Sequence, residues 1–234
     1  MISISTLKSE AKQINSTAEV SPILFTLLFF GISFAIGFVT GFVAPFLSRV
    51  AAGSNSSLVV ITFVELFLSV FVSLFSILLN AGYTIYIMGV RRGERMPYST
   101  LFDGFAIAGK IIALQLLRAL LYTVGFILLF IPGIIVAYCY SFALYNLLDN
   151  PSLSVLDAMR LSRQQTKGVK WDLFLLSLSF IGWYLLTMLT FGILTIYVSP
   201  WLQQSFVGAY RAVTGGDAPS PTENNELPPV GSEN

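Results

Sequence analysis

The feature that most constrains this chain is a series of six apolar stretches, each long enough or nearly long enough to cross a lipid bilayer. The hydrocarbon core of a bilayer is about 30 Å thick and an α-helix rises about 1.5 Å per residue, so one crossing needs about 20 apolar residues. We predict spans at residues 23–47, 58–80 (extending to about 90), 110–130, 133–149, 171–188 and 190–212. Residues 1–213 would then form one all-α membrane domain, a bundle of six transmembrane helices with short cytoplasmic interfacial helices.

The composition supports a membrane protein and argues against an enzyme. Hydrophobic residues make up 55% of the chain, far above the content of a soluble domain. There is no histidine, and the one cysteine, Cys139, lies inside a predicted span, which excludes an internal disulfide and any histidine-based catalytic or metal site. No Gly-rich phosphate loop and no nucleophile with a nearby base is recognisable. We therefore expect no catalytic residues, no metal and no cofactor.

The basic residues indicate the orientation of the chain. Of the 13 lysines and arginines, 11 fall on one side of the predicted spans, Arg49 falls on the other, and Arg118 lies within a span. The positive-inside rule places the basic side, and with it both termini, in the cytoplasm. Residues 214–234 are rich in Gly, Pro, Ser, Asn and Glu, so we expect a disordered cytoplasmic tail.

Short helices are predicted before each pair of spans. Apolar residues recur at helical spacing over residues 4–14, and residues 100–103 and 154–157 both match the capping box that begins a helix. The helix after Ser154 should run to about Lys167 and stop at Gly168. The pattern predicts three units, each consisting of an interfacial helix, an outward span and a returning span. Within the second unit, Pro132-Gly133 is expected to form the turn between the two spans.

The second predicted span carries a polar stripe at steps of three and four residues. Its members are Thr62, Glu65, Ser69, Ser73, Ser76, Asn80 and Thr84. Unsatisfied polar groups are costly in hydrocarbon, so the stripe should face other helices or water. Two interpretations remain open. The stripe either forms hydrogen bonds between helices, or it is a polar pathway or ligand-binding face with Glu65 as its ionisable member.

Other intramembrane residues leave alternatives open as well. Arg118 could pair with Glu65, although their predicted depths differ by about 10 Å, or could extend to the inner interface. Residues 33, 37 and 41 are Ser, Gly and Gly, whose spacing indicates a helix-packing face, within the protein or between two copies. Residues 138, 141 and 145 are Tyr, Ser and Tyr on one face of the fourth span, where they could bond a neighbouring helix or contact a ligand.

The predicted helix after Ser154 has a basic face. Arg160, Arg163 and Lys167 follow at steps of three and four residues, and the opposite face carries Val155, Ala158, Met159 and Ser162. Such a helix would lie at the inner leaflet with its basic face near lipid phosphates. The three basic residues either contact anionic lipid or a partner, or only orient the chain.

Several short motifs in residues 131–200 resemble those of a known family. In chain order they are Ile131-Pro132-Gly133-Ile134-Ile135, Asp149-Asn150-Pro151, Lys170-Trp171, Ser179-Phe180-Ile181-Gly182-Trp183, Gly192-Ile193 and Pro200. This string resembles an uncharacterised family of bacterial integral membrane proteins, a domain of unknown function, over residues of about 100–212. The chain departs from the family's common Gly-His-Lys-Trp in having Val169 between Gly168 and Lys170. The resemblance implies a bacterial cytoplasmic membrane and supplies no activity.

The sequence therefore favours a non-enzymatic membrane module that binds lipid, peptide or a protein partner in envelope homeostasis. Membrane lipids are the expected partners, a protein or peptide is a further one, and no nucleic acid is expected. The alternative is a small transporter or channel-like protein that uses the polar face of the second span. The candidate polar face is Glu65, Ser69, Ser73, Ser76 and Asn80, the intramembrane charge is Arg118, and the lipid or partner contacts are Arg160, Arg163 and Lys167.

Overall fold

Every element of the described chain is helical. The computed structural model describes residues 3–18, 20–43, 45–46, 58–128 and 130–215. Within these ranges it contains no strand, so the all-α prediction is confirmed. The predicted outer connection 48–57 and almost all of the predicted tail lie outside the described residues.

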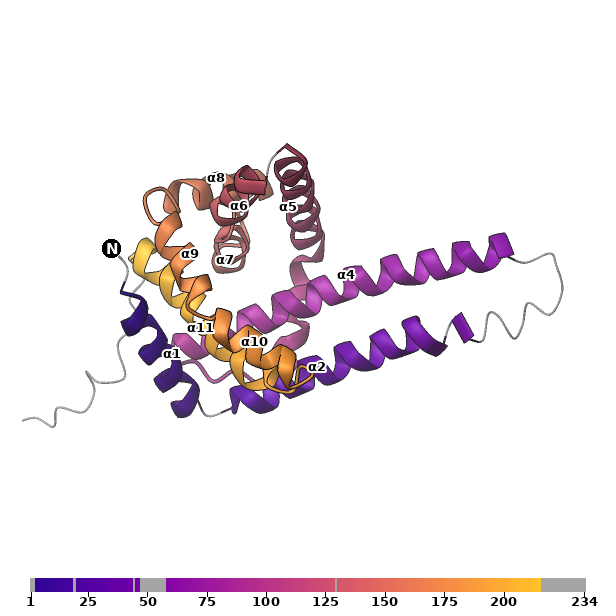
Figure 1. The fold of residues 1–234 in the computed structure, drawn as a ribbon, viewed down its shortest axis with the longest axis horizontal. Helices are drawn as coiled ribbons and strands as arrows, with labels where there is room; N and C mark the ends of the chain where they lie inside the picture. Colours follow the sequence, from indigo (N-terminus) through magenta and orange to yellow (C-terminus); the bar gives the residue numbers. More distant parts are fainter. Residues whose placement is uncertain (1–2, 19, 44, 47–57, 129, 216–234) are drawn as a thin grey trace, which may run out of the picture.

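The first helical hairpin consists of α2 (Pro22–Phe38) and α4 (Leu58–Arg91), and α2 continues into a π-helical segment, η1 (Val39–Val43). The two helices run side by side and extend away from the rest of the molecule (Figure 1). Their phenylalanine side chains are exposed there; for example, Phe34 is 75% and Phe67 is 74% exposed. The surface of this hairpin is therefore suited to hydrocarbon rather than to water.

Helix α1 (Ile4–Thr17) precedes this hairpin and packs mainly against α11 (Thr195–Thr214). Leu7 and Ala11 are buried, as its apolar periodicity predicts. Lys8, next to Leu7, also contacts the rest of the protein. Its Nζ donates to the Ser179 carbonyl at 3.1 Å and lies 4.2 Å from the Phe180 ring centroid. Burial lowers the pKa of Lys8.

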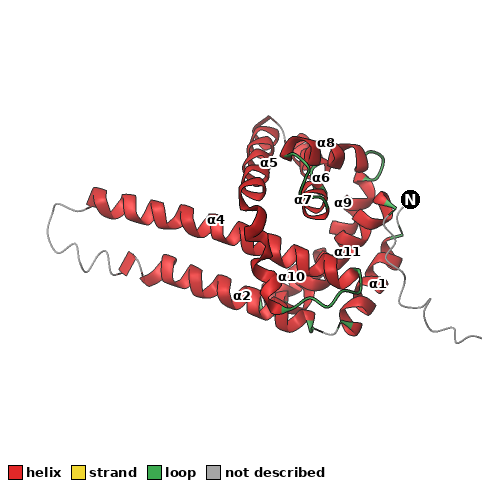
Figure 2. Ribbon diagram, turned by 180° about the vertical axis from the view of Figure 1, so that it is seen from behind, coloured by secondary structure: helices red, strands yellow, loops and turns green. Residues whose placement is uncertain are grey.

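The second hairpin follows the 3₁₀ helix η2 (Tyr98–Ile107). It consists of α5 (Ala108–Leu128) and a broken return through α6 (Phe130–Cys139) and α7 (Ala143–Asp149). In both views α5 runs across α4 rather than alongside it (Figures 1 and 2). The second hairpin therefore extends in a different direction from the first.

The third hairpin follows α8 (Val155–Gln165) and runs from α9 (Lys170–Leu178) and α10 (Ile181–Leu189) back through α11. Its tip is the Phe191-Gly192 turn, where both residues have positive φ and the Phe191 side chain is 98% exposed. The element order thus follows the predicted three units, since a short helix precedes each hairpin.

Four helical segments of the described chain are long and apolar enough to cross a membrane. They are Pro22–Phe42, Thr62–Arg91, Tyr98–Ile127 and Lys170–Leu189. Six spans are not confirmed. The fourth predicted span is interrupted at residues 140–142, and its two helices have only 10 and 7 residues. The sixth, α11, has adjacent Gln203, Gln204 and Ser205 near its middle, which lower its hydropathy.

Three local predictions can be compared with the structure. Ser154 is the N-cap of α8, and its Oγ accepts from the Asp157 backbone N–H at 3.1 Å, as predicted. Thr100 is not an N-cap, because η2 already begins at Tyr98. Pro132-Gly133 is not the turn of the second hairpin, because α6 begins at Phe130 and contains both residues in its first turns. Proline is tolerated there because first-turn N–H groups have no helical acceptor.

Charged residues connect the bases of the hairpins. Asp149, the last residue of α7, accepts from Arg211 at 2.9 Å, from Arg92 at 3.2 Å and from the Tyr210 hydroxyl at 2.9 Å. At the end of α4, Arg91 pairs with Glu10 of α1 at 2.9 Å. These contacts hold α1, α4, α7 and α11 together at one end of the molecule.

Helix η2 lies against the backbone of α4. A Cβ on Gly82 would collide with the Leu101 carbonyl, and a Cβ on Gly104 would lie 2.5 Å from the Leu78 carbonyl oxygen. Only glycine permits this approach at either position. The pair of glycines therefore fixes where the second hairpin leaves α4.

We predict that Gly82→Ala destabilises the protein by about 1–3 kcal/mol, because the new methyl group meets rigid backbone. Thermal unfolding of the detergent-purified protein measures the effect. Gly109→Ala is the matched control, since a Cβ there meets nothing within 4 Å. In an exposed helix this change should be neutral or stabilise by about 0.4–1 kcal/mol. Equal melting temperatures of the two variants would contradict the prediction.

Candidate functional site

The polar stripe of α4 divides into two parts. Ser69 and Ser73 are exposed on the section of α4 that extends beyond the other hairpins, whereas the inner end of the stripe lies between helices. Each of these serines donates to the carbonyl four residues earlier, at 2.7 and 2.8 Å. This bond satisfies a hydroxyl without a neighbouring helix. Glu65 and Ser76 are half-buried, and Glu65 lies on the same extended section.

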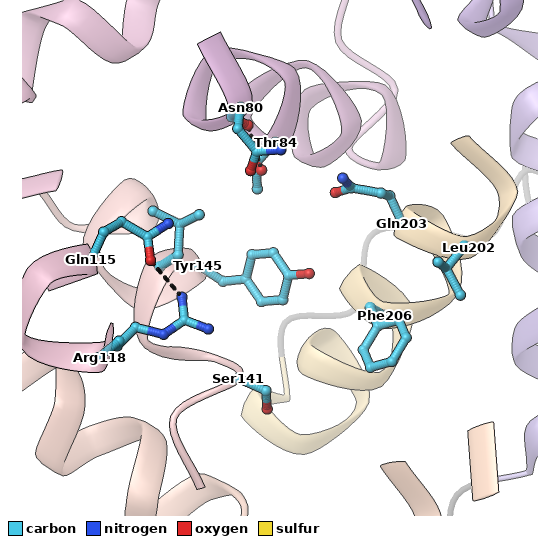
Figure 3. Close-up of a pocket in the computed structure, with 10 residues that line it drawn as sticks. Asn80, Thr84, Gln115, Arg118, Ser141, Tyr145, Leu202, Gln203 and Phe206 are labelled. Carbon is cyan, nitrogen blue, oxygen red and sulfur yellow. Dashed lines mark hydrogen bonds between the residues drawn. The ribbon is translucent and has the colours of Figure 1, made fainter. Parts of the chain in front are cut away.

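The inner end of the stripe reaches a cavity. The cavity has a volume of about 300 Å³ and lies between α4, α5, the α6–α7 segment and α11 (Figure 3). Its polar lining consists of Asn80, Thr84, Gln115, Arg118, Ser141 and Gln203, with the hydroxyl-bearing Tyr145 beside them. Leu144, Leu202 and Phe206 supply the apolar part of the wall. Two separate sequence candidates, Asn80 and Arg118, therefore meet in one place.

Arg118 does not approach Glu65. It lies beside Asn80 and Thr84, whereas Glu65 is 15 residues, or about 22 Å, from Asn80 along α4. An arginine side chain cannot cover that distance, so the predicted pairing is wrong. The Arg118 guanidinium instead donates to the Tyr122 hydroxyl at 3.0 Å and to the Gln115 carbonyl oxygen at 3.3 Å.

The basic face of α8 is exposed as the sequence predicts. Arg160, Arg163 and Lys167 are all exposed, while Ala158, Met159 and Ser162 on the other face are buried. Arg160 pairs with Asp157 one turn earlier at 3.2 Å, and both side chains are exposed. The helix ends at Gln165, two residues before the predicted end at Lys167, and the turn that follows contains Gly168 with a φ of +91°.

The buried face of α8 supports the break between α6 and α7. The Ser162 hydroxyl donates to the Cys139 carbonyl at 2.9 Å and accepts from the Phe142 N–H at 3.2 Å. The Thr166 hydroxyl also reaches the Cys139 carbonyl, at 3.3 Å. A helix break exposes backbone groups that must find partners when buried. Two side chains of α8 therefore supply partners that the broken helix lacks.

The predicted small-residue face of α2 does not pack inside the protein. A Cβ on Gly37 or on Gly41 would meet nothing within 4 Å. The expectation of internal packing at these glycines is wrong for the described residues. Gly41 also falls within η1, where the wider π-helical turn changes the four-residue register.

Some lining residues of the cavity had no signal of their own in the sequence. Gln203 stands in a polar run of the last helix, and Gln115 lies three residues before Arg118 on α5. Ser141 and Tyr145 share the predicted face of the fourth span and both line the cavity, while Tyr138 donates to the Ser177 hydroxyl at 2.9 Å. The three-residue spacing of Gln115 and Arg118 on α5 was the one sequence pattern that could have predicted that these two side chains lie together.

Comparison with known proteins identifies a family but no activity. Residues 63–217 match the family described as "Protein of unknown function (DUF975)". This match covers more than half of the 234 residues, so the chain belongs to that family. It also begins upstream of residue 100, where the sequence resemblance begins, and so includes most of α4. No curated protein and no solved structure matches the chain.

We predict that Ser162→Ala costs about 1–3 kcal/mol of stability, because it removes a partner from the Cys139 carbonyl and from the Phe142 N–H. Ser9→Ala is the control, because the exposed Ser9 hydroxyl bonds only the Thr6 carbonyl of its own helix. The Ser9→Ala substitution should alter the free energy of unfolding by no more than about 0.5 kcal/mol. Unfolding of both variants in detergent, followed by circular dichroism, tests the difference; an unaltered Ser162→Ala protein would contradict it.

Proposed function

We propose that this member of the DUF975 family is a non-enzymatic integral membrane module that binds anionic lipid through α8, in the maintenance of the bacterial cell envelope. One observation carries the proposal. Arg160 and Arg163 of α8 are exposed, as is Lys167 in the turn that follows the helix, and the opposite face of α8 is packed into the protein. A cationic face held in a fixed position attracts an anionic surface.

The position of α8 supports a role at the membrane surface. Lys110, near the start of α5, donates to the Pro151 and Leu153 carbonyls at 2.6 and 3.1 Å and so holds the segment that leads into α8. Asp149 and its arginine partners lie just before this segment. The α10–α11 turn, where Phe191 is exposed, lies at the far end of the third hairpin from α8 (Figure 1). With that turn in hydrocarbon, α8 would lie nearer the headgroup level.

Lipid fits this face better than a specific protein or peptide partner. The exposed groups are three basic side chains on α8 and the turn after it, and such a group suits a diffuse anionic surface. Each basic residue near such a surface contributes about 1 kcal/mol. Arg160 should contribute less, because Asp157 already neutralises part of its charge. The face should therefore provide about 2–3 kcal/mol in total.

Transport along the α4 stripe is the alternative function. The cavity at Asn80 and Thr84 could belong to a pathway, but Ser69 and Ser73 lie on the exposed section and bond their own helix. A continuous polar path would need these hydroxyls to face an enclosed space. The geometry of α8 therefore favours lipid binding over transport.

One prediction of the proposed function concerns the basic face. Replacing Arg160, Arg163 and Lys167 together with glutamine should lower the retention of anionic lipid by about 30- to 150-fold in affinity, which corresponds to about 2–3 kcal/mol. Native mass spectrometry of the purified protein in mixed phosphatidylglycerol and phosphatidylcholine nanodiscs measures the lipids retained. The remaining helices keep the protein in the membrane, so its localisation should not change.

The control for this experiment keeps the charge. A variant with Arg160→Lys and Arg163→Lys should retain anionic lipid nearly as the wild type does, because the attraction depends on charge rather than on guanidinium geometry. If the glutamine variant also retains anionic lipid like the wild type, the basic face serves only to orient the chain, and the proposal fails.

The second prediction concerns orientation. We propose that both termini and α8 lie in the cytoplasm, from the 11-to-1 distribution of basic residues. In a Cys139→Ser background, an impermeant thiol reagent added to intact cells should label a cysteine at Asn55 and should not label one at Glu94 or Gln164. The latter two positions are exposed, so their protection would reflect the membrane rather than burial. Labelling of Gln164→Cys in intact cells would refute this topology.

A further inference from the structure

The cavity around Arg118 has the chemistry of an anion site. We infer that it binds a phosphate group, supplied either by a lipid headgroup or as the free anion. The cavity is separate from the exposed face of α8, so this inference does not rest on the proposed function. Its support comes from the charge, the hydrogen-bond donors and the shape of the lining.

The charge of Arg118 has no counterion in the described part of the chain. At the base of the hairpins, Arg91, Arg92 and Arg211 each pair with a carboxylate. Arg118 contacts only neutral groups, the Tyr122 hydroxyl and the Gln115 amide. A guanidinium removed from bulk water is stabilised by an anion that accepts its hydrogen bonds. The cavity has room for such an anion on the side where Arg118 faces Tyr145 and Phe206 (Figure 3).

The other polar side chains of the lining add hydrogen-bond donors and no negatively charged group. The side-chain amides of Asn80 and Gln203 have no hydrogen-bond partner among the described residues, and Gln115 uses only its carbonyl oxygen. Each amide nitrogen can donate. No carboxylate lines the cavity. A lining of one guanidinium and three amides suits an oxyanion and excludes a metal cation.

The size and the apolar wall of the cavity restrict the class of ligand further. A volume of about 300 Å³ lies at the lower end of the range for ligand pockets and suits a headgroup rather than a whole lipid. Leu144, Leu202 and Phe206 form an apolar wall next to the donors. A phosphate that carries a glycerol or acyl portion could use both parts of this lining, whereas the free anion would use only the donors.

The cavity lies two to three helical turns from charged residues on three helices. Arg118 is eight residues from Lys110 on α5, and Gln203 is eight residues from Arg211 on α11, or about 12 Å along the helix in each case. Asn80 is 11 residues, or about 16 Å, from Arg91 along α4. The site lies between helices and not on the exposed face of α8, so a ligand in it would be distinct from lipid bound at that face.

Binding by the wild type and by Arg118→Gln provides the test. Thermal unfolding of detergent-solubilised protein is titrated with inorganic phosphate, with a short-chain phosphatidylglycerol and with oleate, and native mass spectrometry counts the molecules retained. We expect saturable stabilisation of the wild type by one phosphate-bearing compound at a stoichiometry of one. The apparent affinity should fall by about tenfold or more in Arg118→Gln, because a charge-assisted bond is lost.

The separate titrations distinguish the two possible sources of the phosphate group. Stabilisation by phosphatidylglycerol alone identifies a lipid headgroup, and stabilisation by inorganic phosphate identifies the free anion. Lys12→Gln removes one exposed charge elsewhere and should bind like the wild type. If Arg118→Gln does not fold, Gln203→Leu removes an amide donor and should weaken binding several-fold. Equal binding by wild type and the cavity variants would overturn the inference, as would stabilisation by oleate without any by phosphate.

Discussion

The arrangement of the three hairpins depends on the ion pairs at their bases, and above all on Asp149. Its carboxylate accepts bonds from the end of α4 through Arg92 and from the end of α11 through Arg211 and Tyr210. The hairpins diverge from this region (Figure 1), and many large apolar side chains are exposed along their described parts. Apolar surfaces do not drive helices together in hydrocarbon, where lipid packs against them equally well. Polar contacts at the base therefore provide much of what fixes the relative positions of the helices.

The parts of the fold that the sequence predicted are those determined over short distances along the chain. The Ser154 cap and the two faces of α8 follow from side chains within one or two turns of each other. The expected helix start at Thr100 did not hold, because a contact with α4 through Gly82 and Gly104 determines the form of η2. That contact joins segments about 20 residues apart, and neither periodicity nor a capping pattern contains it.

The same distinction applies to the candidate site. Asn80 and Arg118 each stood out as polar residues in an apolar helix, but their meeting depends on α5 running across α4. The alternative in which Arg118 pairs with Glu65 required α5 to lie alongside α4. Gln203 completes the cavity from α11, about 85 residues along the chain from Arg118, and no local pattern distinguishes it from the neighbouring Gln204.

The bonds of Ser162 across the break between α6 and α7 connect the two proposed binding regions. Ser162 lies on the opposite face of α8 from Arg160, and it bonds Cys139 and Phe142, which lie on either side of the cavity residue Ser141. Any displacement of α8 that preserves these bonds also displaces one wall of the cavity. Tightening of α8 onto a charged membrane would thus be transmitted to the cavity as a change in its width. The broken helix thus joins the surface helix to the interior through hydrogen bonds.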